Sequence, residues 1–432
     1  MRIPTLTASL ILSSVLLSSR LTAQDIDKII NPTEVEKIEK TLSSDEMQGR
    51  GTFSPGIEKA ADFIEAQFRA AGLQSWKNSG SYRQPFSMIR TKVLSTSGSV
   101  DGVIQGPGQI AIFSAQTHIK VDEHSGYEKV WVKAGDPASA LYKYTQADKN
   151  LVVFVDTSFT RPFSRLAAPG RARFSSPVNV VFILTTAKDP THFTAEADQQ
   201  ISEQKLANVV GILPGKTKEK EFVIFSGHYD HLGIGKPNAA GDSIYNGAND
   251  DASGSTAVIM LAKYFAERHD NERTLIFATF TAEEIGGFGS QYFSRQFDPA
   301  AVAAMFNIEM IGTESKWGTN SAYITGYERT DMGKILEKNL EGSPFHFYPD
   351  PYPTQQLFYR SDNATLARQG VPAHTLSTSK MDSEKYYHQL GDEIGTLDMN
   401  NMAQIIKSIA VSSRSIIQGK DTPSRVDTTQ LR

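Results

Sequence analysis

From residue 207 onward, short apolar runs alternate with stretches in which apolar residues recur at helical spacing. The apolar runs have the length and composition of strands, and they lie at 208–213, 222–225, 275–280, 304–308 and 371–376. Helices are predicted at 257–265, directly after Glu284, at 329–340 and at 397–418. The run at 275–280 is apolar almost throughout, which is typical of a strand buried on both faces. This alternation predicts an α/β fold, in which helices cover both faces of a sheet.

The chain before residue 207 has two parts of different texture. Residues 33–73 carry apolar positions at helical spacing, interrupted by a polar, glycine-rich loop at 43–51. From 91 to 200, short β-rich runs are separated by turn residues, and no helical period is sustained. The predicted organisation is 24–90 for the N-terminal part of the main domain, 91–200 for an inserted β-rich subdomain, 201–419 for the rest of the main domain and 420–432 for a loose polar tail.

Residues 1–23 have the pattern of a cleaved signal peptide. Arg2 supplies a positive start, an apolar core follows at 10–17, and Ala23 precedes a predicted cleavage point at Gln24. Serines interrupt the core, which makes it too short and too polar to span a bilayer. The sequence therefore predicts export to the periplasm or the medium.

The composition excludes several classes of function. The 432-residue chain is 21% charged and 39% hydrophobic, which is typical of a globular protein. Its formal net charge is −4 and it has no long basic block, so nucleic acid is not expected as a partner. The chain has no cysteine, which excludes disulfides and thiol-based catalysis. Any zinc ligands must therefore be histidine, aspartate or glutamate.

Ionisable residues cluster at the predicted strand ends. They are His228 and Asp230 after 222–225, Asp250 and Asp251 before the 257–265 helix, Glu283 and Glu284 after 275–280, and Glu309 after 304–308. Ligands of open α/β sheets bind beyond the carboxyl ends of the strands, so these side chains are expected to converge. Imidazoles and carboxylates are zinc ligands, and a spare glutamate can transfer protons. We therefore predict a metal-dependent active site at this edge.

Each of these residues also has an ordinary structural interpretation. A single histidine such as His228 is more often a core or surface residue, and Asp250 at a helix start can be a cap. His388 on its own is a loop residue. A site is favoured because several separate elements deliver polar residues to one edge of the sheet. Three residues stay outside the predicted ligand set, namely His231, His374 and Asp362.

Three motifs resemble those of a known family. They are Gly227-His228-Tyr229-Asp230-His231, Gly247-Ala248-Asn249-Asp250-Asp251-Ala252-Ser253-Gly254 and Glu283-Glu284. With them, the chain resembles the zinc-dependent exopeptidases typified by bacterial leucyl aminopeptidase and Streptomyces aminopeptidase, to which glutamate carboxypeptidase and glutaminyl cyclase are related. The similarity runs from Leu42 to His388, apart from the 91–200 insertion. It implies a three-layer mixed sheet with helices on both faces, two zinc ions and a peptide substrate.

The resemblance implies two metal sites joined by one carboxylate. The first zinc would be held by His228, Asp250 and Glu309, and the second by Asp250, Glu284 and His388. The family usually has aspartate where Glu309 stands. Glutamate offers the same carboxylate on a longer arm, so we expect Glu309 to bind metal with an altered geometry.

The resemblance also implies roles for residues beside the metals. Glu283 would be the general base, taking a proton from the attacking water and returning it to the leaving amine. Asp230 would support His228 from outside the coordination sphere. Asp251 would hold the turn after Asp250.

The family's commonest activity predicts an aminopeptidase, and three other interpretations stay open. A carboxypeptidase needs a basic residue for the substrate carboxylate, and Arg360 and Lys385 lie near the motifs. A glutaminyl cyclase would use one zinc and would not need a complete second site. A non-catalytic binding protein would use the insertion as its interaction surface. The sequence determines neither the preferred substrate side chain nor the oligomeric state, and it does not separate zinc from cobalt or manganese.

Overall fold

The structure, a computed structural model, describes residues 26–106, 108–168 and 172–431. The chain divides into two compact units. The main unit comprises the described parts of Met1–Pro85 and Ala207–Arg432, and the inserted unit is Phe86–Leu206. The sequence analysis placed an insertion at 91–200, and the second compact unit runs from Phe86 to Leu206. The predicted signal peptide at 1–23 lies outside the described residues and stays a prediction.

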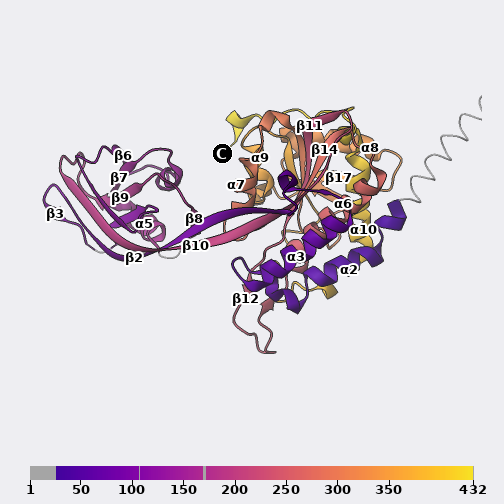
Figure 1. Cartoon of the computed structure of the whole chain (residues 1–432), viewed down its shortest axis with the longest axis horizontal. Coiled ribbons are helices and arrows are strands. Elements are labelled where there is room, and N and C mark those ends of the chain that lie inside the picture. The colour runs from indigo at the N-terminus through magenta and orange to yellow at the C-terminus, as the bar shows by residue number, and fades with distance from the viewer. Residues whose placement is uncertain (1–25, 107, 169–171, 432) are drawn as a thin grey trace, which may run out of the picture. The chain divides into compact units, whose positions relative to one another are not determined.

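A mixed sheet forms the centre of the main unit (Figure 1). In spatial order its strands are β17 (His346–Pro349), β16 (Ser321–Ile324), β18 (Ala373–Ser377), β15 (Val302–Ile308), β11 (Lys218–His228), β14 (Arg273–Phe280) and the end of β10 (Phe193–Leu213). β11 runs parallel to β14 and β15, and β15 runs parallel to β18. β10 pairs antiparallel with β14, and β16 pairs antiparallel with β18. Short strands complete the unit, with β1 (Gln74–Ser75) on β10 and β12 (Gly233–Ile234) on β13 (Ile244–Tyr245).

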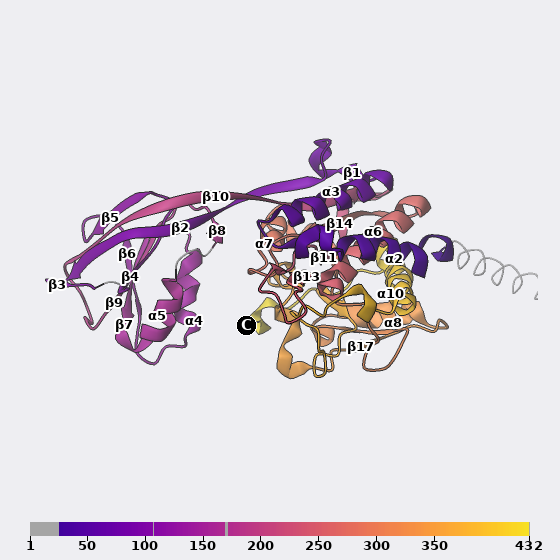
Figure 2. The same cartoon turned by 90° about the horizontal axis from the view of Figure 1, so that it is seen from below.

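Helices cover both faces of this sheet, as Figures 1 and 2 show. One core includes residues of α2 (Pro32–Leu42), α3 (Pro55–Ala70), α6 (Ser253–Arg268), α8 (Met332–Leu340), α10 (Met399–Ser412) and α11 (Arg414–Ile417). The other includes residues of α7 (Phe288–Ser294) and α9 (Asn363–Ala367). Alternate residues of β11 enter the two cores, Val223 and Phe225 the first and Ile224 the second. The predicted three-layer α/β architecture is confirmed.

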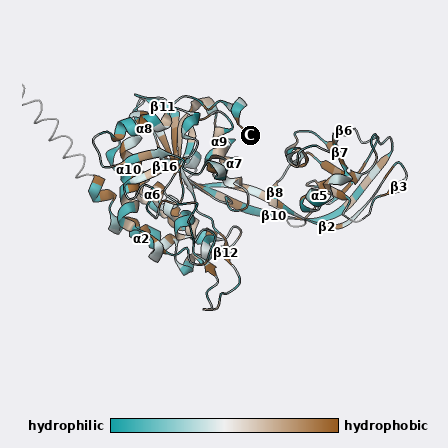
Figure 3. Cartoon of the chain, turned by 180° about the vertical axis from the view of Figure 1, so that it is seen from behind, coloured by the Kyte–Doolittle hydropathy of each residue, from teal (hydrophilic) through white to brown (hydrophobic). Residues whose placement is uncertain are grey.

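Stacked aromatic rings fill the centre of the first core. The ring centroid of Phe225 lies 5.0 Å from that of Phe306, 5.5 Å from that of Phe265 and 5.6 Å from that of Phe277. All eight residues of β14 are buried, as predicted for 275–280. Figure 3 shows hydrophobic colours along the central strands of this unit. Because these strands are buried on both faces, charged side chains are displaced to the strand ends.

Two predicted helices are delayed or divided in the structure. The helix predicted directly after Glu284 begins only with α7, because Gly286 and Gly287 adopt positive φ and interrupt the helical geometry. The helix predicted at 397–418 is divided at Ser413 into α10 and α11. Across the part of the chain that the structure describes, every helix is too short or too polar to cross a membrane.

The described residues of the inserted unit contribute strands to the 12-stranded sheet and form a separate four-stranded sheet and two short α-helices. In the first sheet, β2 (Arg83–Val100) and β10 pair with β3 (Val103–Ile104), β5 (His118–Asp122) and β8 (Ala172–Phe174). The second has the order β4 (Ile110–Phe113), β9 (Val180–Thr185), β7 (Leu151–Asp156) and β6 (Glu128–Val132). The helices α4 (Ser139–Tyr142) and α5 (Thr160–Leu166) pack into the core of the second sheet. Four- and seven-residue helices are too short to give the sustained period that sequence analysis detects.

The C-terminal segment differs from the predicted loose tail. Nη1 of Arg425 donates a hydrogen bond to the carbonyl of Val302 at 2.8 Å. The side chain of Val426 is buried, and its backbone N–H donates to the carbonyl of Gly370 at 3.1 Å. The prediction of a loose tail at 420–432 is therefore wrong, because two side chains within a polar segment anchor it to the main unit.

Candidate metal centre

The parallel strands bring ionisable residues to one edge of the main sheet. His228 ends β11 and lies in register with Phe280, the last residue of β14. Glu283 and Glu284 follow β14 within a few residues, and Glu309 directly follows β15. Because parallel strands end at the same edge, side chains that are far apart in the sequence meet there.

One group of donor atoms comes from His228, Asp250 and Glu309. Its nitrogen and carboxylate oxygens all lie within 4.8 Å of one another. Nε2 of His228 is 3.2 Å from Oδ1 of Asp250, and both side chains are buried. The structure thus brings together the three residues expected at the first metal site.

A second group comprises His231, Asp250 and Glu284, whose donor atoms also lie within 4.8 Å of one another. Nε2 of His388 adjoins this group, 3.2 Å from Oδ2 of Asp250 and 3.1 Å from Oε2 of Glu284. Asp250 therefore belongs to both groups, with Oδ1 near His228 and Oδ2 near His388. A carboxylate in this position can bridge two cations.

Several buried donor atoms of the two groups lack a hydrogen-bond partner among the described residues. They are Nε2 of His228, Nε2 of His231, Oδ2 of Asp250 and Oε2 of Glu309. Buried polar atoms in folded proteins are nearly always paired, and an unpaired one costs about 1–3 kcal/mol. A divalent cation would supply the missing partner for the unpaired atoms of His228, Asp250 and Glu309. The donor set therefore fits a metal centre.

The charges of the centre are strongly coupled. Burial disfavours the charged form of Asp250, but the adjacent imidazoles of His228 and His388 outweigh it and lower the pKa of Asp250. The adjacent carboxylates of Asp250 and Glu284, that of Asp250 first, raise the pKa of His388 to about 10. Burial raises the pKa of Glu309 to about 7 and that of Glu283 well above its usual value. Carboxylates thus outnumber the imidazoles that can neutralise them, which favours cation binding.

Asp251 connects the elements that carry the ligands. Its Oδ2 accepts the backbone N–H of His228 at 3.1 Å, while Oδ1 accepts those of Gly254 at 3.0 Å and Met310 at 3.1 Å. The end of β11, the start of α6 and the residues after β15 are therefore held by one carboxylate. A Cβ at Gly254 would overlap this carboxylate and the carbonyl of Ile308, so the approach requires glycine.

Asp230 differs from its expected role. Nδ1 of His228 lies 3.1 Å from the backbone carbonyl of Asp230 and 3.8 Å from its carboxylate. The carboxylate instead accepts the backbone N–H of Glu283 at 3.0 Å and the hydroxyl of Thr52 at 2.8 Å. The backbone of Asp230 thus orients the imidazole, and its side chain positions the segment that carries the predicted base.

Two residues that sequence analysis missed also shape the centre. Asp392 accepts the backbone N–H groups of Asn249 at 2.8 Å and Asp250 at 3.0 Å, which fixes the segment that leads into the shared carboxylate. No sequence pattern marked Asp392. Arg50 is fully buried and donates to backbone carbonyls only. The position of Arg50 between two glycines of the loop at 43–51 was the one sequence feature that could have pointed to a structural role for it.

The residues left outside the predicted ligand set have different surroundings. Nδ1 of His231 lies 2.7 Å from Oε1 of Glu284, inside the second group. His374 contacts the backbone carbonyl of Thr325 through Nδ1 at 2.8 Å and belongs to neither group of described residues. Burial raises the pKa of Asp362 to about 6, and this residue also belongs to neither group.

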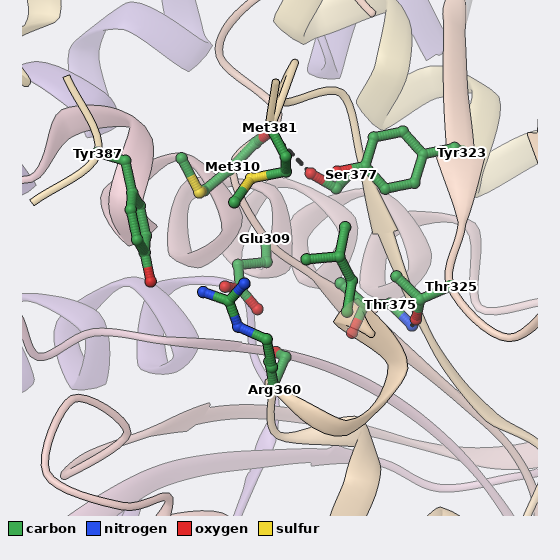
Figure 4. A pocket seen from close by; sticks show the side chains of 11 residues that line it. Glu309, Met310, Tyr323, Thr325, Arg360, Thr375, Ser377, Met381 and Tyr387 are labelled. Carbon is green, nitrogen blue, oxygen red and sulfur yellow. Dashed lines mark hydrogen bonds between the residues drawn. The ribbon is translucent and has the colours of Figure 1, made fainter. Parts of the chain in front are cut away.

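A pocket opens beside Glu309 (Figure 4). Its other lining residues are Met310, Tyr323, Thr325, Leu357, Arg360, Ser361, Thr375, Ser377, Met381 and Tyr387. The side chains of Arg360 and Tyr387 extend toward Glu309. Lys385, the other basic residue near the motifs, does not line this pocket. The pocket therefore combines apolar, hydroxyl and cationic groups next to the first donor group.

Sequence similarity to known proteins is concentrated in this part of the chain. Residues 208–412 match peptidase family M28. A "Probable zinc metalloprotease" of Pyricularia oryzae is 34% identical over 113 residues, which are 26% of this chain and 22% of that protein. A "Vacuolar membrane protease" of Saccharomyces cerevisiae is 23% identical over 250 residues, 56% of this chain and 24% of that protein. The matched parts thus span about a quarter of the length of these curated relatives.

Solved structures share the fold at low sequence identity. An aminopeptidase from Aneurinibacillus sp. strain AM-1 aligns with a TM-score of 0.52 and 18% identity, over 94% of this chain and 97% of that one. A zinc aminopeptidase from Bacillus subtilis aligns with a TM-score of 0.52 and 14% identity, over 92% and 98% of the two chains. A peptidase M28 precursor from Shewanella amazonensis aligns with a TM-score of 0.53 and 15% identity, over 95% of this chain and 99% of that one. Residues 208–412 of this chain are therefore similar in sequence to peptidase family M28, and the solved structures show that the chain shares the fold of zinc aminopeptidases.

Proposed function

We propose that this protein is an exported zinc aminopeptidase that uses two metal ions and a glutamate base. The observation that carries the proposal is the pair of donor groups that share Asp250. The similarity of residues 208–412 to peptidase family M28 supports peptide hydrolysis as the reaction. Several solved structures of this fold are described as aminopeptidases, which supports a preference for the amino end.

The donor set suits zinc at both positions. His228, Asp250 and Glu309 would hold one ion, and Asp250, Glu284 and His388 would hold the other. All donors are nitrogen or oxygen atoms, as the absence of cysteine requires. When bound, zinc supplies a Lewis acid that lowers the pKa of water and polarises a carbonyl. Oε2 of the buried Glu309 carboxylate has no hydrogen-bond partner among the described residues, and burial raises the pKa of Glu309 to about 7.

Glu283 is the proton carrier of the proposed reaction. Burial and the nearby carboxylates of Asp362 and Glu309 raise its pKa well above the usual value, so it binds a proton readily. Glu283 accepts a proton from the attacking water and delivers it to the leaving amine. The hydrogen bond from its backbone N–H to Asp230 fixes the segment from which the side chain acts.

The choice of the amino end rests on the solved structures of this fold that are described as aminopeptidases. Arg360 in the adjoining pocket is the observation that favours a carboxypeptidase instead. A single exposed arginine is weak evidence for a carboxylate-binding site, so the aminopeptidase is the function that we propose.

The test is product mass spectrometry on a mixed peptide pool with the zinc-loaded protein. We expect stepwise loss of N-terminal residues and a decrease in rate of about 10²–10⁴ or more for Glu283→Gln with the metal content unchanged. Glu341→Gln, the same change at an exposed residue, is the matched control and keeps full activity. Loss from the C-terminus would reverse the assignment of the substrate end. Loss of ammonia from N-terminal glutamine would support a cyclase, and substantial turnover by Glu283→Gln would refute the role of the base.

Export is proposed from the pattern of residues 1–23 alone. The mass of the protein recovered from the periplasm or the medium tests it, with Gln24 expected as the first residue. Protein that keeps residues 1–23 and stays inside the cell would refute export.

A further inference from the structure

His231 is buried in the second donor group, yet the proposed mechanism gives it no role. We infer that His231 is a positioning residue, whose Nδ1–H holds Oε1 of Glu284 and leaves Oε2 as the single oxygen that faces the second metal. The inference rests on the proposed function, because it concerns how the second metal site of that function is built. Nothing in the family resemblance assigns this role, since the ligand set that it implies does not include His231.

The distances separate His231 from the ligands. Two ligands of one tetrahedral zinc, each at about 2.0–2.1 Å from the metal, lie about 3.3 Å apart. Nε2 of His388 is 3.1 Å from Oε2 of Glu284 and 3.2 Å from Oδ2 of Asp250, which is the spacing of co-ligands. Nδ1 of His231 is 2.7 Å from Oε1 of Glu284, a hydrogen-bond distance, and 3.9 Å from Oδ2 of Asp250. His231 therefore fits a hydrogen-bond donor better than a further ligand.

The two oxygens of Glu284 are divided between two histidines. Oε1 contacts His231 and Oε2 contacts His388. An ionised carboxylate only accepts hydrogen bonds, so Nδ1 of His231 carries the proton in this contact. With Oε1 occupied, Glu284 binds the metal through one oxygen, which limits the coordination number of the second site. Hydrogen bonds of this kind orient metal ligands and affect metal affinity.

The surroundings of His231 hold its ring in place. Its side chain is fully buried, and its backbone N–H donates to the carbonyl of Arg50 at 3.2 Å. A Cβ at Gly247 would lie 2.5 Å from Cδ2 of the ring, so the backbone packs directly against it. The ring packs against that of His388 in a T-shaped arrangement, with 5.8 Å between the ring centroids. Contacts with protein groups alone thus orient the Nδ1 donor of His231, as a positioning residue requires.

The test compares His231→Phe with His231→Asn in the full chain. Phenylalanine keeps a ring and removes the donor, whereas the asparagine amide can place a donor near the position of Nδ1. Zn²⁺ affinity is measured by competition with a chromophoric chelator, stoichiometry by native mass spectrometry, and coordination by the visible absorption of bound Co²⁺. We expect His231→Phe to bind two ions at saturation, with one of them about 10–100-fold weaker and a changed Co²⁺ spectrum for that site only. His231→Asn should recover most of the affinity.

Two reference variants make the outcome decisive. His388→Phe removes a ligand and should bind one ion, and His374→Phe removes a buried imidazole outside both donor groups and should leave binding unchanged. Loss of a whole ion from His231→Phe, as in His388→Phe, would overturn the inference and make His231 a ligand. Binding equal to that of the wild type, or equal weakening of both ions, would also overturn it. Wild-type protein that binds only one ion would refute the two-metal proposal itself, before any variant is compared.

Discussion

Replacing Arg50 with methionine tests how the loops of the metal centre are held. Nε of Arg50 donates to the carbonyl of Tyr229 at 2.9 Å, and Nη2 donates to that of Gly247 at 2.8 Å. Nη1 donates to the carbonyls of Leu42 at 2.7 Å and Asn246 at 2.6 Å. The guanidinium is fully buried, so no water can replace these bonds without rearrangement. One side chain therefore joins the segments that follow and precede the metal ligands to the N-terminal loop.

The expected loss follows from these four bonds. A hydrogen bond to a charged group contributes about 1.5–3 kcal/mol, and each carbonyl left without a donor keeps its desolvation cost. The sum of these four contributions is an upper limit to the loss of stability, because methionine also removes the cost of burying the charge. The same cost lowers the pKa of Arg50. A buried carbonyl left without a donor costs about 1–3 kcal/mol, so four of them, less the gain from removing the buried charge, give a net loss of about 3–5 kcal/mol. We expect Arg50→Met to lower the free energy of unfolding by that amount.

The assay is urea unfolding of the metal-free protein, followed by Zn²⁺ titration of the folded variant. Zn²⁺ affinity should fall together with stability, because Tyr229 adjoins His228 and Gly247 lies just before Asp250. Arg50→Lys is the matched control, because it keeps the charge and loses the planar guanidinium. Its loss of unfolding free energy should lie between those of the wild type and Arg50→Met. A loss below about 1 kcal/mol with wild-type Zn²⁺ affinity would refute the reasoning, since the carbonyls would then have found other donors.

Two further predictions concern the stability of the main unit. Burial raises the pKa of Glu39 to about 8, so the folded protein keeps this residue neutral while the unfolded chain ionises it from about pH 4.5. The free energy of unfolding then decreases as the pH rises from about 4.5 to about 8, by on the order of 1.4 kcal/mol per pH unit. In urea unfolding, Glu39→Gln should show a weaker dependence on pH than the wild type. Equal pH dependence of the two proteins would contradict the prediction. Phe225→Ala removes a ring stacked on three others and should cost about 3–5 kcal/mol by the same measurement, and a cost below about 1 kcal/mol would show that the core refills the cavity.

The sequence by itself determined the layered fold and the edge at which the candidate site lies. The run at 275–280 predicted a strand buried on both faces because its side chains lack polar alternation, and β14 has that burial. Polar residues directly after such strands predicted a shared edge, and the structure brings His228, Asp250 and Glu309 together there. These inferences succeeded because hydrophobic periodicity and the direction of parallel strands are properties that short segments carry.

Only the tertiary structure decided which groups support that edge. His231 meets Glu284 across 53 residues of sequence, and Asp392 meets Asp250 across 142. The carboxylate of Asp230 bonds to the Glu283 backbone rather than to the neighbouring imidazole. None of these contacts leaves a periodic or local pattern, because each depends on where distant loops fold over the sheet. Local chemistry therefore identified candidate ligands, while packing selected the partners that orient them.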